Sequence, residues 1–342
     1  MIAPRARLLR VDPRAGTLAD GFVDELPSLF EPGDLLVVND AATLPASLAG
    51  RTADGEFVEV HLRSAPVGDR CDAVLFGAGD WRTRTEDRAA PPRLGPASRI
   101  VFAPDLSAEI ESLSPLSPRA VALRFDRSGD ALWSALYRHG RPVQYAHEVG
   151  PVPLARFQTP YAARPWAAEM PSAGRPLRLE WIRRLDARGV RTVRLTHAAG
   201  LSATGDPAID RTLPLPERYD VPQIAAEAIR RVREEGGRVV AIGTSVVRAL
   251  EASAASHGGD VVAGEAMTDL VIRRGHGLRV VGGLLSGIHA SDSSHFALLE
   301  AFLPEALAGA YAGHVAREGY REHEFGDSTL ILPGVARHQY FS

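Results

Sequence analysis

The clearest pattern of apolar and polar positions along the chain lies at residues 238–251. Val239–Ile242 is an unbroken and mostly β-branched apolar run, which predicts a strand buried on both faces. Gly243 predicts a turn after this strand, and Thr244 or Ser245 could cap the helix expected to follow. A helix that begins directly after a strand presents unpaired N–H groups and a positive dipole end, which suits an anionic ligand group. The same residues are equally compatible with an ordinary strand–helix unit.

Helical and extended patterns alternate through the rest of the second half of the chain. Apolar residues three and four positions apart predict helices that end near Gly189 and near Gly236. Such alternation is typical of an α/β fold with a mixed, largely parallel sheet. The loops after parallel strands open at one edge, so we expect Thr196–His197, Gly243–Ser245 and Ser286–His289 to share one cleft. The other elements expected here are strands at Val190–Leu195 and Leu278–Val281 and a helix from about Ser293 to Leu303.

The first half of the chain carries shorter apolar segments. Asp34–Val38 is expected to form a strand, and Phe57–Leu62 is expected to form another after an Asp-Gly turn signal. From about residue 60 to 126, short apolar segments are separated by turn residues, which predicts a small all-β unit of barrel type. The expected strands of this unit are Ala73–Phe76, Arg99–Phe102, Ala108–Ser112 and Ala120–Phe125.

The pattern changes again after this unit, where a short helix is expected to end at Gly140. The irregular, proline-rich stretch Arg141–Pro176 follows. Long irregular segments inside compact domains are usually functional or mobile, so this stretch is a candidate site segment. We therefore expect a discontinuous α/β main domain of residues 1–60 and 127–342, with a β-barrel-like domain of residues 61–126 inserted into it.

Composition narrows the possible chemistry. The lone Cys71 excludes an intrachain disulfide framework and any multi-cysteine zinc or iron–sulfur site. All 39 basic residues are arginine, so no lysine is present to bind phosphate in a P-loop or to form a Schiff base. The net charge of -3 gives no support for a generally nucleic-acid-binding surface, so any contact with nucleic acid would be local.

The chain of 342 residues is long enough for two domains. No apolar run approaches the ~20 residues that span a bilayer, and the first residues lack the apolar core of a signal peptide. We therefore expect a soluble cytoplasmic protein that makes no membrane contact. Its oligomeric state does not follow from the sequence.

Several polar residues stand where the expected fold could use them. His197 directly follows a strand, where it could carry a proton or serve as a hydrogen-bonded structural residue. His289 is similar, although the serines after it also suit a helix cap. No His and carboxylate positions have a metal-binding spacing such as HExxH, so no metal is expected. Carboxylates near turns are more often caps or arginine partners than catalysts; here they are Asp40, Glu59, Glu169, Glu251 and Asp327.

Six segments, taken in order, match motifs of one known family. They are GDLLVVND at 33–40, FQTPYA at 157–162, MPSAG at 170–174, GTSVVRALE at 243–251, His289 with Ser293, and FGD at 325–327. The chain resembles the S-adenosylmethionine:tRNA ribosyltransferase-isomerases of queuosine biosynthesis over nearly its whole length. Several motifs in one order are far more specific than any single one.

The resemblance implies an α/β domain with a smaller inserted β-barrel. It also implies that S-adenosylmethionine serves as a ribosyl donor and that tRNA is the acceptor partner. The ribosyl group is transferred and isomerised onto a 7-aminomethyl-7-deazaguanine base to give epoxyqueuosine, with release of adenine and methionine. The residues expected to take part are His197, His289 and Glu217 in catalysis, and Gly243, Thr244, Ser245, Arg248, Asn39 and Ser172 in binding.

Three segments depart from the family pattern. LTHAAGLSA at 195–203 keeps its histidine but loses glycine and threonine positions, whereas GRPL at 174–177 and TLPLPE at 212–217 lose three histidines. Since fold does not carry function across altered sites, two alternatives stay open. The chain could use S-adenosylmethionine or a related small-molecule nucleoside on a different, non-tRNA acceptor, or it could be a catalytically silent binding protein.

Overall fold

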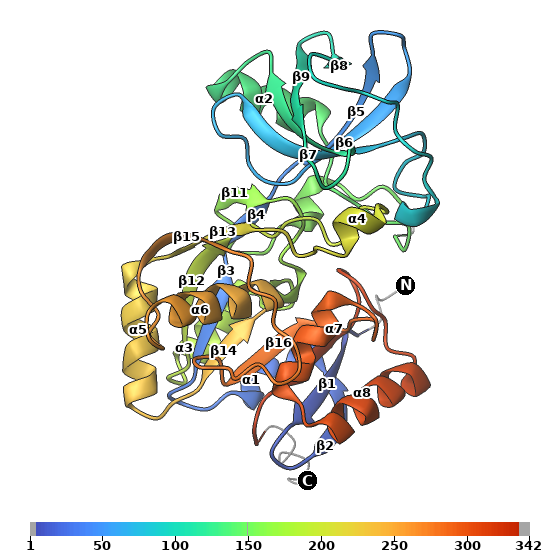
Figure 1. The fold of residues 1–342 in the computed structure, drawn as a ribbon. Helices are drawn as coiled ribbons and strands as arrows, with labels where there is room; N and C mark the ends of the chain where they lie inside the picture. The colour runs from blue at the N-terminus through green and yellow to red at the C-terminus, as the bar shows by residue number, and fades with distance from the viewer. Residues whose placement is uncertain (1–4, 149, 335–342) are drawn as a thin grey trace.

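The computed structural model describes residues 5–148 and 150–334. Figure 1 shows two parts, a β-barrel at one end of the molecule and a sheet covered by helices at the other. A two-stranded sheet of β4 (Ala41–Thr43) and β11 (Arg164–Ala167) lies between them. The expected combination of an α/β unit with a smaller all-β barrel is therefore confirmed.

The large sheet is mixed, with a parallel centre. Its nine strands follow the order β15-β13-β12-β3-β14-β16-β17-β1-β2. The four neighbours β12, β3, β14 and β16 run parallel, as do β17 and β1, whereas the remaining pairs are antiparallel. The strands are β1 (Arg7–Asp12), β2 (Thr17–Phe22), β3 (Leu35–Asn39), β12 (Arg191–His197), β13 (Glu217–Val221), β14 (Val239–Ile242), β15 (Gly264–Thr268), β16 (Gly283–Gly287) and β17 (Ser328–Ile331).

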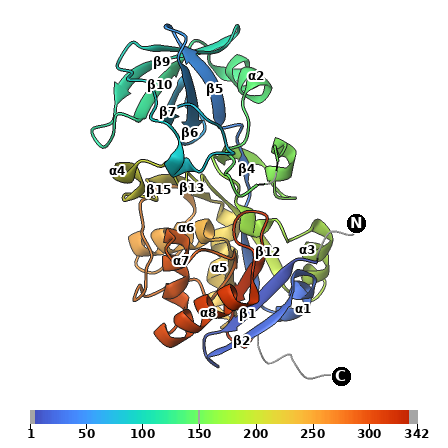
Figure 2. The same ribbon diagram turned by 90° about the vertical axis from the view of Figure 1, so that its right-hand side faces the viewer.

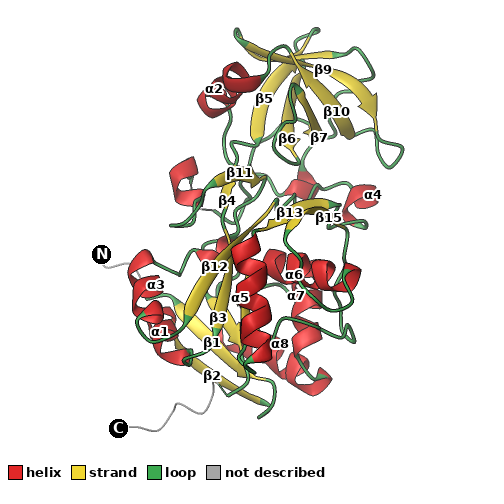
Figure 3. Cartoon of the chain, turned by 90° about the vertical axis from the view of Figure 1, so that its left-hand side faces the viewer, coloured by secondary structure: helices red, strands yellow, loops and turns green. Residues whose placement is uncertain are grey.

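Helices cover both faces of this sheet (Figure 3). Within β14, Val239 and Ala241 belong to the core on one face, and Val240 and Ile242 belong to the core on the other. The prediction that this strand is buried on both faces is confirmed, because all four residues are buried. One face carries α1 (Leu26–Leu29) and α3 (Leu179–Asp186), and the other carries α5 (Gln223–Glu234), α6 (Thr244–Ser256), α7 (Ser294–Leu299) and α8 (Glu305–Glu318).

The barrel is closed and antiparallel, with the order β10-β7-β6-β5-β8-β9. It begins at Ser47, so the expected boundary at residue 61 is wrong. The hairpin of β5 and β6 pairs with β8 on one side and β7 on the other, and without it the barrel would have two open edges. The helix α2 (Gly129–His139) also packs into the barrel core. The strands are β5 (Ser47–Thr52), β6 (Phe57–Leu62), β7 (Arg70–Phe76), β8 (Arg99–Ala103), β9 (Leu106–Leu113) and β10 (Ala120–Phe125).

One predicted strand is absent for a clear reason. Residues 278–281 form no strand, and β16 begins two residues later. The buried carboxylate of Glu251 accepts the backbone N–H groups of Arg279, Val280 and Val281 at 2.8, 3.0 and 2.9 Å. These donors are therefore used by a side chain on α6 rather than by a neighbouring strand.

Short helical elements occur in both parts of the molecule and in the connections between them. Figure 2 shows that α4 lies beneath the barrel, close to the ends of β13 and β15. Among the described residues, no helix is long and apolar enough to cross a membrane. The short elements are α4 (Pro207–Asp210) and the 3-10 helices at Val23–Glu25, Thr85–Asp87, Leu154–Phe157, Ser172–Gly174 and Glu300–Phe302.

Candidate active site

The C-terminal ends of four parallel strands meet at one edge of the large sheet. The neighbours β12, β3, β14 and β16 end at His197, Asn39, Ile242 and Gly287, respectively. Such an edge is where parallel sheets commonly bind ligands, and it is where the sequence pattern predicted a cleft.

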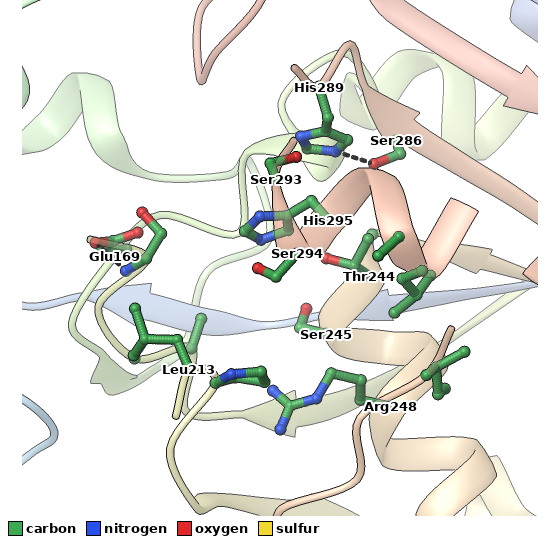
Figure 4. Close-up of a pocket in the computed structure, with 18 of the residues that line it drawn as sticks. Glu169, Leu213, Thr244, Ser245, Arg248, Ser286, His289, Ser293, Ser294 and His295 are labelled. Carbon is green, nitrogen blue, oxygen red and sulfur yellow. Dashed lines mark hydrogen bonds between the residues drawn. The ribbon is translucent and has the colours of Figure 1, made fainter. Parts of the chain in front are cut away.

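A cavity of about 390 Å³ opens at this edge (Figure 4). Gly243–Ser245, which follow β14, line it, and so do Ser286, Gly287 and His289 at the end of β16. Two of the three segments predicted to share a cleft therefore do so, whereas Thr196 and His197 are not part of the wall. Other parts of the wall come from residues within 169–173, 199–202, 210–217, 270–273 and 292–298.

The start of α6 brings backbone donors to the cavity. The helix begins at Thr244 with Gly243 as its N-cap, so the expectation that Thr244 or Ser245 caps it with a side chain is wrong. Gly243 has a φ of 102°, which favours glycine, and a Cβ there would lie 3.3 Å from the Cβ of Ala173. Within the described chain no group accepts a hydrogen bond from the backbone N–H of Thr244 or Ser245. These two donors and the helix dipole can therefore serve an anion.

Arg248 lies one turn into α6 and is 7% exposed. Its guanidinium forms an ion pair with Glu217, and its Nε donates to the carbonyl of Leu270 at 2.9 Å. Glu217 also accepts the backbone N–H of Gly200 at 2.6 Å. The Nη2 of Arg248 has no hydrogen-bond partner among the described residues, although it is buried. A ligand anion in the cavity would satisfy this donor.

His197 lies behind this ion pair. It is fully buried, and its Nε2 is 3.5 Å from a carboxylate oxygen of Glu217. Burial lowers the pKa of His197 to about 4, so its imidazole is neutral at pH 7. Asn39 fixes this corner, because its amide exchanges two 2.9 Å hydrogen bonds with the backbone of His197 and contacts Ser245 Oγ at 3.3 Å. Asn39, like His197, is not part of the cavity wall.

A pair of stacked histidines forms the opposite side of the site. His289 and His295 lie with ring centroids 4.9 Å apart at an angle of 15°, and both line the cavity. His289 Nε2 is 2.8 Å from Ser286 Oγ (Figure 4). Burial lowers the pKa of both histidines, so both rings are neutral near pH 7.

Comparison with known proteins places this site in a family. The profile of the family described as queuosine biosynthesis protein matches residues 3–331. The chain belongs to this family. The resemblance inferred from its motifs is therefore confirmed.

Relatives of this family member cover almost its whole length. A protein of Anaeromyxobacter sp. strain K named S-adenosylmethionine:tRNA ribosyltransferase-isomerase is 36% identical, and the alignment covers 97% of this chain and 94% of the relative. A Thermus thermophilus protein of the same name is 37% identical, covering 91% and 87%. The crystal structure of the S-adenosylmethionine tRNA ribosyltransferase of Thermotoga maritima matches with a TM-score of 0.52 at 22% identity, covering 97% and 94%. That structural likeness concerns the fold.

The fold brings most of the expected site residues to the wall of the cavity. The cavity wall includes two of the three expected catalytic residues, which are His289 and Glu217. It also includes five of the six expected binding residues, which are Gly243, Thr244, Ser245, Arg248 and Ser172. Their roles stay predictions, and His197 and Asn39 lie behind the wall.

Sequence reasoning identified Ser172 and the stretch Arg141–Pro176 as candidates, but it missed Glu169 and His295. Glu169 and Ser172 both line the cavity, which places the proline-rich stretch Arg141–Pro176 at the site. Glu169 was expected to be a cap or an arginine partner, yet it contacts no arginine in the described chain. Its only sequence signal was its position directly before the MPSAG motif. His295 was missed because no motif marked it and it lies within the helix expected from about Ser293 to Leu303.

The prediction that the protein uses no metal rested on linear spacing alone. The fold brings His147, Glu148 and Glu324 together, with ligand atoms within 4.8 Å of one another. His147 Nε2 lies 2.7 Å from Glu324 and 3.5 Å from Glu148, which is also the geometry of an ordinary ion-paired cluster. The absence of a metal therefore stays a prediction.

Proposed function

We propose that the chain is an S-adenosylmethionine:tRNA ribosyltransferase-isomerase. It transfers and isomerises the ribosyl group of S-adenosylmethionine onto 7-aminomethyl-7-deazaguanine in tRNA and releases adenine and methionine. The observation that carries this proposal is membership of the family over residues 3–331, with named relatives aligned over nearly the whole chain. An acceptor tRNA would place the reaction in the cytoplasm.

The cavity supports the proposal because its size and its donors suit the donor substrate. A volume of about 390 Å³ lies within the range of sites that hold small ligands. We infer that the carboxylate of the methionine moiety binds the free N–H groups of Thr244 and Ser245 together with Arg248 Nη2. Ser172, from the facing segment, would close this end of the site.

The reaction needs proton transfer as well as substrate binding. The sulfonium acidifies the adjacent ribose carbon, a base removes a proton there, the sugar ring opens with loss of adenine, and the acceptor amine attacks. A neutral His289, oriented by Ser286, would serve the departing adenine as a hydrogen-bond donor or proton carrier. Glu217 would hold Arg248 in place, and we infer that His197 acts through Glu217 rather than on the substrate.

The direct test measures both products. Purified protein is incubated with S-adenosylmethionine and tRNA that carries 7-aminomethyl-7-deazaguanine, and adenine and methionine are quantified. We expect equal amounts of the two products, and none with the same tRNA carrying guanine at that position. No adenine release under conditions where the Thermus thermophilus relative is active would overturn the proposal.

A second candidate function follows from the wall at residues 199–202. Ala199, Leu201 and Ser202 belong to the segment that departs from the family motif, and all three line the cavity. A changed wall could admit an acceptor other than tRNA. Adenine release with a small amine nucleoside, together with the absence of any tRNA mobility shift, would favour this candidate.

A further inference from the structure

Of the four carboxylates in the cavity wall, only Glu217 has an arginine or histidine within ion-pair distance in the described chain, and Asp210, Asp292 and Glu169 have none. Glu217 is paired with Arg248, and Asp210 accepts both the N–H and the hydroxyl of Thr204, at 2.8 and 2.6 Å. Glu169 has no arginine or histidine within ion-pair distance in the described chain. Its Oε1 accepts from the Tyr145 hydroxyl and from the N–H of Ser202 at 2.8 Å.

The second carboxylate oxygen of Glu169, Oε2, is available to accept a proton or a hydrogen bond from a ligand. No hydrogen bond to Oε2 exists among the described residues, and the side chain borders the cavity (Figure 4). Figure 4 shows Glu169 on one side of the cavity, with Thr244 and Ser286 on the other. A carboxylate placed in this way can reach a ligand held between these two walls.

We propose that Glu169 is the base that removes the proton from the ribose carbon next to the sulfonium. This inference rests on the proposed function. In the step, one C–H bond breaks and one O–H bond forms on Glu169. The electron pair stays on the carbon, where the sulfonium stabilises it, and the carboxylate becomes a neutral carboxylic acid.

The other candidates for the base are less suitable. Asp292 is exposed, and Arg119 interacts with the charge of Asp210. Both oxygens of Glu217 are engaged, one by Gly200 and the other by Arg248. His197 does not reach the cavity. Since burial lowers the pKa of His289 and of His295, both are weaker proton acceptors than an ordinary histidine.

The electrostatics of Glu169 agree with this role. Burial raises its pKa to about 7, while the hydrogen bonds from Tyr145 and Ser202 oppose the rise and the charge of Glu324 adds to it. The charge of Glu169 is among those that raise the pKa of His147, which pairs with Glu324. A general base works best with a pKa near the working pH. The missing counter-charge would be supplied by the sulfonium of the substrate.

The test compares Glu169→Gln and Glu169→Asp with Glu148→Gln. The control residue Glu148 belongs to the same segment but does not line the cavity. We expect Glu169→Gln to lower kcat for adenine release about 10²–10⁴-fold, the usual contribution of a general base. S-adenosylmethionine binding, measured by calorimetry, should change much less. Glu169→Asp should restore part of the rate, and Glu148→Gln should behave as wild type.

A second variant keeps the inference testable if Glu169→Gln does not fold. Tyr145→Phe removes a donor that stabilises the ionised form of Glu169, so the midpoint of the pH–rate profile should move to higher pH. A purely structural role of Tyr145 would leave the midpoint in place. An active wild type with an unchanged rate in Glu169→Gln, or an unmoved midpoint in Tyr145→Phe, overturns this inference alone. An inactive wild type overturns the proposed function, and this inference with it.

Discussion

Two glutamates, one in the barrel and one at the cavity, show opposite effects of the protein interior. Glu59 in β6 accepts hydrogen bonds from Ser47 at 2.6 Å, His61 at 2.8 Å and Arg88 at 2.9 Å. Burial alone would raise its pKa, but His61, Arg88 and Ser47 outweigh burial and lower the pKa from 4.5 to about 2. Glu169 has no cationic partner among the described residues, and burial raises its pKa from 4.5 to about 7.

The difference separates a structural carboxylate from a chemical one. Glu59 is held as an anion whose charge is balanced within the barrel. The charge of Glu169 is left for a ligand to balance, which costs stability in the free protein. The positively charged Arg248 also lacks a partner for one of its groups. One of its buried N–H groups makes no hydrogen bond in the described chain.

The largest effect is expected at Arg248, which pairs with Glu217 and has one unpartnered donor for the substrate carboxylate. Arg248→Ala removes the donors for the substrate carboxylate and leaves the largely buried Glu217 without its cationic partner. We expect S-adenosylmethionine to bind at least about 100-fold more weakly, which corresponds to about 3 kcal/mol. The free energy of unfolding should also fall by about 3–5 kcal/mol. Calorimetry and urea titration measure the two quantities.

The control for this variant is Arg274→Ala. Arg274 pairs with Glu300 and Glu305 and is 42% exposed, so its removal should change stability by less than about 1 kcal/mol and leave binding unchanged. Unchanged S-adenosylmethionine binding in Arg248→Ala would refute the assignment of the anion site.

Glu59 should contribute to stability alone. Because its pKa is lowered in the folded state, its contribution is present above about pH 4.5 and is lost as the pH falls toward 2. Glu59→Gln should therefore lower the free energy of unfolding by about 3 kcal/mol at pH 7 and by far less at pH 3. Adenine release by the folded variant should match wild type. The exposed Glu56→Gln is the matched control, and a pH-independent loss would contradict this view of Glu59.

For Glu169 we expect the free energy of unfolding to change with pH in the opposite direction to that for Glu59. Its raised pKa means that the folded state binds more protons than the unfolded state between pH 4.5 and about 7, so stability falls as the pH rises through this window. Glu169→Gln removes the cost of ionisation and should be more stable than wild type at pH 8, by about 1–2 kcal/mol because the side chain is partly exposed. Near pH 4 the two proteins should unfold alike. Urea titrations at both pH values decide, and a variant less stable than wild type only at pH 8 would mean that Glu169 has a hidden cationic partner.

Much of the scaffold was predictable because it depends on local patterns. The run Val239–Ile242 predicts a doubly buried strand in any context, and the glycines after the helices mark where those helices end. The fate of residues 278–281 was not predictable, since it depends on the carboxylate of Glu251 reaching their N–H groups from another element. The barrel boundary likewise depends on the pairing of β5 with β8, which are far apart in sequence.

The residues of the candidate site also fall into a group that was predictable from the sequence and a group that was not. Motifs indicated Gly243–Ser245, Arg248 and His289, because these residues sit at strand ends and helix starts that the chain itself defines. The importance of Glu169 follows from what is missing around it, and the absence of a counter-charge is a property of three-dimensional packing. The same holds for His197, whose position after a strand predicted access to the cleft but not its complete burial.

The smallest expected effect concerns the backbone donors at the start of α6, which lack partners as Glu169 lacks a counter-ion. Gly243→Ala forces a side chain into a φ of 102° and against Ala173, which should cost about 1–2 kcal/mol of stability. Because the turn also sets the direction of the N–H groups of Thr244 and Ser245, S-adenosylmethionine should bind several-fold more weakly. Gly236→Ala is the matched control. Gly236 has a φ of 74°, and no described atom lies within 4 Å of the position that a Cβ would take there. This variant should therefore lose stability without losing affinity. Equal binding by the two variants would show that the anion is held by Arg248 alone and that the helix start contributes only to the fold.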